Sequence, residues 1–182
     1  QATATAGSAV VFAGATVVIA LVGLVVVNIP FLTVMGLAAA VTDSPDEREL
    51  DKPLRGALMG ALGILGADPQ AFGMAMEIER ESRGDGQVDP SLAAASVGIV
   101  AAGGTPDDFE RYLEAIRSAR TPQEELRYLY ALPDFRDAML VDRTVGMTLT
   151  DEIRTQNVPG VLARSMANRE HGGRAWAFAK DH

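Results

Sequence analysis

The chain has 182 residues, about the length of one domain, with a formal net charge of −8 and no cysteine. The acidic balance argues against nucleic acid as a partner, because a phosphate-binding surface needs clustered Lys and Arg. The absence of cysteine excludes disulfides and thiolate metal sites.

The charges are confined to one part of the chain. From Gln1 to Thr42 there is no Asp, Glu, Lys, Arg or His, so all 24 acidic and all 16 basic residues follow this segment. So sharp a change in composition predicts a boundary. We expect an apolar segment over residues 1–42, a junction at 43–46 and a second domain over 47–182.

The first segment has the composition of a membrane-spanning helix. Val10–Val27 is an almost uninterrupted apolar run, and residues 4–27 together are long enough to cross a bilayer, which takes roughly 20 residues. In lipid the backbone must satisfy its own hydrogen bonds, which favours a helix despite the many β-branched residues. Asn28–Pro30 ends this helix, and Phe31–Val41 begins a second one too short to span.

A buried hairpin in a soluble core is the alternative for the same residues. It would need protein on all sides, because the run has no polar face. If residues 4–27 face lipid, the membrane is a partner and the protein is membrane-bound. If they face protein, a cytoplasmic location is expected.

Three stretches of this segment, Thr5–Gly14, Thr16–Leu24 and Ile29–Ala39, resemble in order and spacing a transmembrane region of MMPL-type transporters of the resistance-nodulation-division superfamily. The resemblance implies one transmembrane helix, a short turn and the start of another. Members of that family move lipids or hydrophobic compounds with the proton gradient. Since no ionisable residue occurs here, no proton-relay residue is implied.

From Glu47 onward the sequence predicts helices with regular punctuation. Four pairs place a capping side chain directly before a proline, which suits the first turn of a helix. The pairs are Asp68-Pro69, Asp89-Pro90, Thr105-Pro106 and Thr121-Pro122. Thr121 also begins a Thr-x-x-Glu capping box with Glu124. The starts are 21, 16 and 16 residues apart. Helices this short with short links must be antiparallel neighbours.

Apolar spacing supports these helices. The leucines of the first one share a face, and Phe109, Tyr112, Leu113 and Ile116 follow amphipathic spacing, which Leu126, Leu129 and Tyr130 repeat. The first face consists of Leu54, Leu58, Leu62 and Leu65. Further helices are predicted over 134–147, 158–169 and from 173 onward. The sequence thus predicts an all-α fold, a HEAT-like α-solenoid of antiparallel helix pairs preceded by the transmembrane-type helix. An irregular helical bundle is the alternative.

Four blocks of the second segment resemble the C-terminal HEAT-like domain of zinc aminopeptidases of the aminopeptidase N and puromycin-sensitive class. They are Asp51–Gly66, Thr121–Leu132, Glu152–Pro159 with its Arg-x-Gln-Asn sequence, and Arg174–His182 with its Trp-x-Phe-x-Lys-Asp sequence. The resemblance covers about residues 45–182. It implies a curved helical array that closes over a catalytic domain and shapes a peptide chamber. It also implies that the array is truncated at His182.

No catalytic centre is visible in the chain. Zinc peptidases need His-Glu-x-x-His, which is absent, and the only histidines are His171 and His182. We therefore expect no metal site and no cofactor in this chain, with zinc confined to the catalytic domain of the parent family. The acidic first turns around Asp107 and Glu124 are better explained by the helix dipole than by metal binding.

Arg154 and Gln156 are the candidate peptide-contacting residues. The matching family block faces the inner chamber, and an arginine can pair with a peptide carboxylate in two-point geometry. The alternative for Arg154 is a structural link to carbonyls or to Glu152. A peptide or a catalytic domain on the concave face is the expected partner.

Two functions from different classes follow. The helical part is expected to be a non-catalytic portion of a zinc aminopeptidase that shapes or gates the peptide chamber. Residues 1–41 alternatively mark a fragment of an MMPL-type transporter. Because neither family normally contains the other, a chimera of the two stays open.

Overall fold

The computed structural model describes residues 51–84 and 87–182, and these residues form helices and connecting turns without any strand. The elements are α3 (Asp51–Gly60), the π-helical turn η1 (Ala61–Leu65), α4 (Pro69–Ser82), α5 (Pro90–Ala102), α6 (Pro106–Ser118), α7 (Pro122–Leu129), the 3-10 turn η2 (Leu132–Asp134), α8 (Ala138–Met147), the 3-10 turn η3 (Thr155–Asn157), α9 (Val158–Met166) and α10 (Gly172–Asp181).

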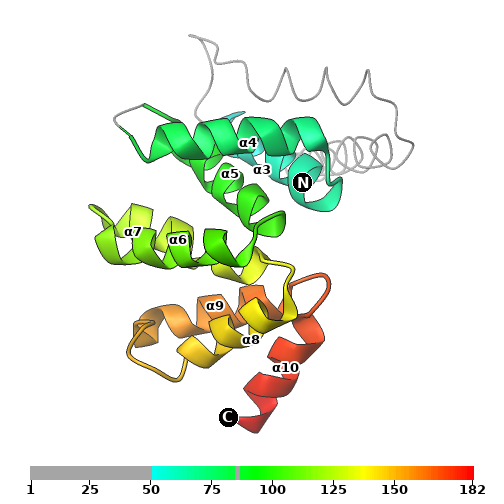
Figure 1. The fold of residues 1–182 in the computed structure, drawn as a ribbon, viewed down its shortest axis with the longest axis vertical. Coiled ribbons are helices and arrows are strands. Elements are labelled where there is room, and N and C mark those ends of the chain that lie inside the picture. The colour runs from blue at the N-terminus through cyan, green and yellow to red at the C-terminus, as the bar shows by residue number, and fades with distance from the viewer. Residues whose placement is uncertain (1–50, 85–86) are drawn as a thin grey trace, which may run out of the picture.

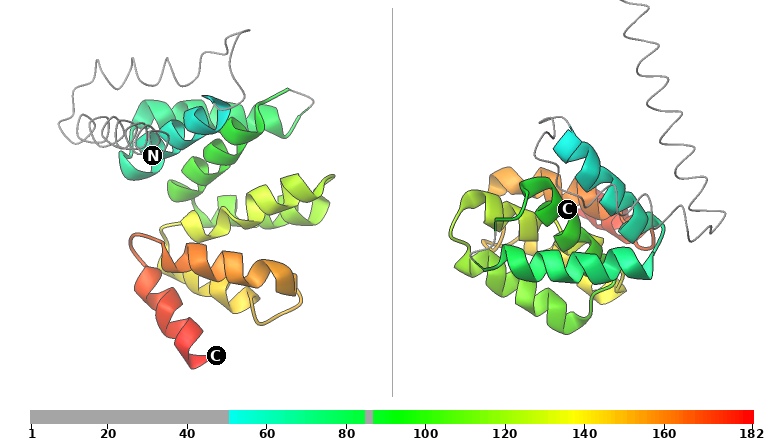
Figure 2. Two further views of the ribbon diagram at one scale, coloured as in Figure 1. Left: turned by 180° about the vertical axis from the view of Figure 1, so that it is seen from behind. Right: turned by 90° about the horizontal axis from the view of Figure 1, so that it is seen from above.

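The helices stack in successive layers along the long axis of the molecule. The helices α3, α4 and α5 pack together at one end, α6 pairs with α7 in the middle, α8 pairs with α9 next, and α10 lies at the far end (Figures 1 and 2). Links of a few residues between paired helices make them antiparallel. The all-α array of helix pairs predicted from the sequence is therefore confirmed for the described residues.

All four predicted helix starts are confirmed, and each is capped as expected. The side chains of Asp68, Asp89, Thr105 and Thr121 accept hydrogen bonds from backbone N–H groups of the first turn. A proline follows each cap, where its missing N–H leaves no intrahelical bond unmade. Local chemistry alone thus determines where α4 to α7 begin.

The capping box predicted at Thr121 is only half formed. The Glu124 N–H donates to the Thr121 hydroxyl over 3.2 Å, but the Glu124 carboxylate accepts from the N–H of Arg120, one residue before the cap. The complete box lies at the neighbouring helix, where Asp108 accepts from the Thr105 N–H over 2.9 Å. The shorter Asp side chain reaches back to the cap residue itself.

The buried face of the first helix differs from the predicted one. Leu54 and Leu65 are 51% and 59% exposed, whereas Met59 is fully buried. The buried face is the one on which the backbone of α3 approaches α5 closely, since a Cβ atom on Gly56 would lie 2.8 Å from the Ser91 carbonyl oxygen. The π-helical turn then shifts the register of the chain and places Gly63 against Ile99.

Aromatic side chains of the predicted amphipathic faces form the centre of the core. Phe109 and Phe135 meet edge to face with ring centroids 5.2 Å apart, and Tyr112 and Tyr128 do the same at 5.0 Å. All four side chains are almost fully buried. This cluster joins α6, α7 and the chain after η2, as the spacing of Phe109, Tyr112 and Leu113 predicts.

Two of the later helices are shorter than predicted. The helix expected over 134–147 begins at Ala138, since Asp137 caps it and Phe135 leaves the preceding turn in an extended conformation to enter the core. The helix expected over 158–169 ends at Met166, because the Asn168 side chain accepts from two following N–H groups and turns the chain.

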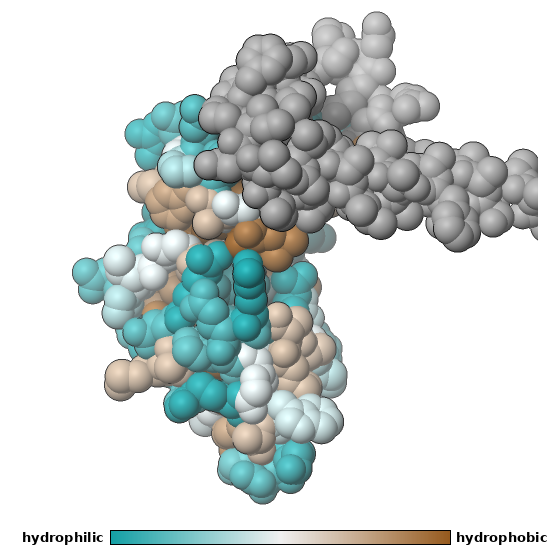
Figure 3. Space-filling view, turned by 90° about the vertical axis from the view of Figure 1, so that its right-hand side faces the viewer, coloured by the Kyte–Doolittle hydropathy of each residue, from teal (hydrophilic) through white to brown (hydrophobic). Residues whose placement is uncertain are grey.

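On the face shown in Figure 3, hydrophilic side chains cover the middle of the described surface, with smaller apolar areas beside them. None of the helices within residues 51–84 and 87–182 is both long and apolar enough to cross a bilayer. The predicted transmembrane helix over residues 4–27 lies outside the described residues.

Candidate functional site

Arg154 and Gln156 lie on one exposed turn between α8 and α9. Ile153 and Asn157, on either side of them, are buried at 3% and 6% exposure and anchor the turn in the core. The residues between these anchors, including Arg154 and Gln156, face solvent. The structure therefore presents both predicted side chains outward on a fixed backbone.

The ion-pair partner of Arg154 is Glu125 of α7, and not Glu152, the acid that the alternative interpretation named. Its Nη2 atom donates to Oε2 of Glu125 over 3.0 Å, and the side chain of Arg154 is still 63% exposed while that of Glu125 is 19% exposed. Glu152 instead accepts from the hydroxyl of Thr150. A surface ion pair of this kind adds little stability. Because the pair uses one of the five N–H donors of the guanidinium, the others can donate to a ligand.

Gln156 shares the turn with Arg154, but no hydrogen bond joins the two side chains. Within the part of the chain that the structure describes, its carboxamide is not hydrogen-bonded to any residue. The side chain thus has both a donor and an acceptor facing solvent.

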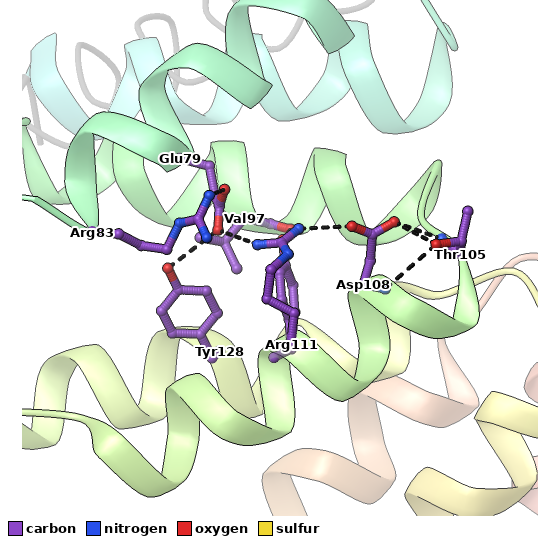
Figure 4. A network of polar contacts seen from close by, with 8 residues as sticks. Glu79, Arg83, Val97, Thr105, Asp108, Arg111 and Tyr128 are labelled. Atoms are coloured by element: carbon purple, nitrogen blue, oxygen red, sulfur yellow. Dashed lines mark hydrogen bonds and ion pairs between the residues drawn. The ribbon is translucent and has the colours of Figure 1, made fainter.

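A second polar arrangement, the Glu79 network, joins α4 to α6 and α7 (Figure 4). The Glu79 side chain, 3% exposed, accepts from Arg111 over 2.8 Å and pairs with Arg83 at 3.1 Å. The Tyr128 hydroxyl also donates to it over 3.3 Å. Arg111 continues the network to Asp108 at 2.8 Å. A buried carboxylate with three donors is fully compensated.

The network shifts the acidity of its neighbours. Burial, reinforced by the charge of Glu79, raises the pKa of Tyr128 to about 12 and that of Tyr112 further. Burial alone would raise the pKa of Asp108, but hydrogen bonds from Arg111 and Thr105 outweigh it and hold that pKa below its usual range. The tyrosines stay protonated and Asp108 ionised at neutral pH, which suits a structural tie.

Sequence reasoning missed this network, although the sequence carries a signal for its centre. Ala71, Ala75 and Glu79 are spaced i, i+4 and i+8 and share the buried face of α4. A charged residue on a buried face requires a partner. The partner itself, Arg111, lies 32 residues further along the chain.

The remaining sequence candidates for metal binding are engaged elsewhere. His171 and His182 lie at opposite ends of α10, about 16 Å apart at 1.5 Å per residue, and each contacts a backbone carbonyl. Glu110 pairs with Arg143. No group of three or more metal-ligating side chains occurs within the described ranges.

Comparison with known proteins gives two matches. The family of the ERAP1-like C-terminal domain matches residues 33–182, and the MMPL family matches residues 1–42. Both resemblances predicted from the sequence are confirmed.

Two curated proteins are similar to parts of the chain. The chain is 30% identical over 112 residues to "Probable aminopeptidase 2" of Sulfurisphaera tokodaii, which is 62% of this chain and 14% of that protein. It is 64% identical over 42 residues to "Membrane protein YdfJ" of Bacillus subtilis, which is 23% of this chain and 6% of that protein. The chain thus spans a small part of each relative.

Proposed function

The chain belongs to the family of ERAP1-like C-terminal domains, and on that premise we propose that its helical part shapes or gates the peptide-binding chamber of a zinc aminopeptidase. The observation that carries this proposal is the family match over the whole helical array. The similarity to a probable aminopeptidase supports it. The catalytic zinc would reside in a separate catalytic domain.

Within this function, Arg154 and Gln156 contact the peptide. The Arg154 guanidinium is well exposed, fixed by one hydrogen bond to Glu125, and carried on a turn anchored by buried neighbours. A guanidinium held in this way can donate to a peptide carboxylate or carbonyl without a large loss of side-chain freedom. The carboxamide of Gln156 can pair with a peptide backbone in both directions.

Peptide binding by the full chain tests the proposal. Fluorescence anisotropy of a labelled mixture of nonapeptides, with the chain in mild detergent, would report the affinity. We expect Arg154→Ala to weaken binding about tenfold and Gln156→Ala about threefold, since each removes one or two hydrogen bonds. Arg143→Ala is the matched control, because Arg143 is also an exposed arginine paired with a glutamate, Glu110. Equal affinities of the Arg154 and Arg143 variants would contradict the proposed contact.

The chain alone is not expected to hydrolyse peptides. An aminoacyl-anilide assay with added zinc should show no turnover, because no His-Glu-x-x-His motif is present to hold the metal. Turnover that a chelator abolishes would contradict the non-catalytic role.

A second function, membrane attachment by residues 4–27, is favoured by the MMPL match. The segment has no ionisable residue, so we propose attachment rather than proton-driven transport. The full chain should float with phosphatidylcholine vesicles on a density gradient. Val18→Arg should reduce flotation, because it places a charge in the middle of the apolar run. Leu149→Arg, at an exposed leucine of the helical part, is the control. Equal flotation of both variants would count against attachment through this segment.

A further inference from the structure

A pocket of about 230 Å³ opens between four elements: α5, α7, η2 and α9. Its apolar wall includes Ala94 and Gly98 of α5 and Leu126 of α7. This volume is below the roughly 300–1,000 Å³ of clefts that hold drug-sized ligands. The pocket therefore suits a molecule with one short apolar side chain and a few polar groups.

A carboxylate without a hydrogen-bond donor, Asp134, lines this pocket. A Cβ atom on Gly98 would be 3.1 Å from Oδ2 of Asp134, so the carboxylate lies against the backbone of α5. Within residues 51–84 and 87–182, no group donates a hydrogen bond to this side chain. Burial raises the pKa of Asp134 from 3.8 to about 6, and the charge of Arg164 offsets only part of the rise. The site lacks a hydrogen-bond donor, ideally a cationic one.

Two guanidinium groups lie elsewhere on the pocket lining. Arg164 of α9 lies over the ring of Tyr130, 5.2 Å from its centroid, and donates to the Tyr130 carbonyl over 3.3 Å. Arg127 of α7 forms neither an ion pair nor a hydrogen bond with any residue in the described part of the chain. Both guanidinium groups line the same pocket as Asp134. The lining thus combines one carboxylate with two guanidinium groups.

We propose that this pocket binds a free α-amino acid with an apolar side chain. Its ammonium group donates to Asp134, its carboxylate accepts from Arg127 and Arg164, and its side chain packs against Leu126 and the small residues of α5.

The charge distribution selects this class of ligand over simpler ones. A simple cation would meet two guanidinium groups, and a simple anion would meet a desolvated carboxylate. A zwitterion carries a partner for both kinds of charge, and the pocket is too small for a peptide of several residues. The inference rests on the pocket alone and does not depend on the proposed peptide-chamber role. Hydrolysis of peptides from their amino terminus is the class of reaction that supplies such a ligand.

Titration calorimetry of the full chain with leucine, at neutral pH, tests the proposal. Leucinamide lacks the carboxylate and N-acetyl-leucine lacks the ammonium group, so each should bind about tenfold or more weakly than leucine. Glycine lacks the apolar side chain and should also bind more weakly. No measurable leucine binding, or equal binding of leucine and leucinamide, would overturn the proposal.

Variants locate the binding to this pocket. Asp134→Asn and Arg127→Gln should each weaken leucine binding about tenfold or more, and Arg143→Gln, at an exposed arginine outside the pocket, should leave it unchanged. Thermal melting of each variant checks that the fold is kept. Leucine binding that survives Asp134→Asn and Arg127→Gln in folded protein would place the ligand elsewhere and overturn the assignment. Loss of peptide binding in Arg154→Ala with leucine binding intact would separate this pocket from the proposed function.

Discussion

Glu79 and Asp134 are two carboxylates in one helical array with opposite surroundings. Glu79 is nearly fully buried and receives hydrogen bonds from Arg111 and Tyr128 and an ion pair from Arg83. Asp134 is partly buried beside a pocket and receives no hydrogen bond from the described residues, and the charge of Arg164 offsets part of the rise in its pKa.

The presence or absence of hydrogen-bond donors distinguishes a structural carboxylate from one in a binding site. A carboxylate with matched donors ties helices together, whereas a partly buried one without them carries a desolvation cost that a proton or a ligand reduces. Glu79 therefore belongs to the scaffold of α4, α6 and α7. Asp134 belongs to the proposed ligand site. The desolvation that lowers stability there is relieved when the ammonium group of the ligand donates to this carboxylate.

Removing the charge of Glu79 should have the largest effect. Glu79→Gln leaves Arg111 and Arg83 without their shared carboxylate, and we expect a loss of about 3 kcal/mol in the free energy of unfolding, measured by urea denaturation. Glu114→Gln, at the exposed pair with Arg117, should leave the urea midpoint unchanged. Equal midpoints of the two variants would mean that the Glu79 network does not tie the helices.

The same type of substitution at Asp134 should act in the opposite direction. The native state holds this proton more tightly than the unfolded chain, so the contribution of Asp134 to stability is most favourable below pH 3.8 and is lost as pH rises through about 6. Asp134→Asn should therefore stabilise the protein at pH 8 by about 2 kcal/mol, less than a fully buried group would give. The gain should disappear at pH 4. Urea denaturation at both pH values checks this, and a destabilised variant at pH 8 would break the contrast with Glu79.

A smaller effect is expected at the Tyr128 hydroxyl. Tyr128→Phe removes one of the donors to Glu79 and should cost about 1 kcal/mol in thermal or urea unfolding. Tyr130→Phe is the matched control, because the structure shows no hydrogen bond from the Tyr130 hydroxyl to the described residues. If both substitutions had the same effect, the Tyr128 hydroxyl would add nothing to the compensation of Glu79.

The parts of the fold predicted from sequence are those whose cause is local. Asp68, Asp89, Thr105 and Thr121 cap helices because each contacts N–H groups two or three residues away. The predicted buried face of the first helix was wrong, because Gly56 and Gly63 pack closely against α5, more than 30 residues further along the chain. Such contacts depend on how helices stack, which spacing alone does not encode.

The sites were harder to predict for the same reason. The position of Glu79 on a buried face was detectable, but its pairing with Arg111 depends on the packing of α4 against α6. Asp134 was expected inside a helix over 134–147 and instead ends the short turn η2, which places it beside Gly98. Arg154 and Gln156 are exposed as a contact site requires, and their role in peptide contact stays a prediction.

The ionisation of Asp134 tests the contrast most directly and can be followed by NMR through its carboxyl carbon across pH 3 to 8. We expect a midpoint near the pKa of about 6. We also expect an upward shift in Arg164→Gln, because the offsetting charge is lost, and no shift in Arg127→Gln. A midpoint close to 3.8 in the unmodified chain would show that Asp134 is compensated like Glu79, and the contrast between the two carboxylates would not hold.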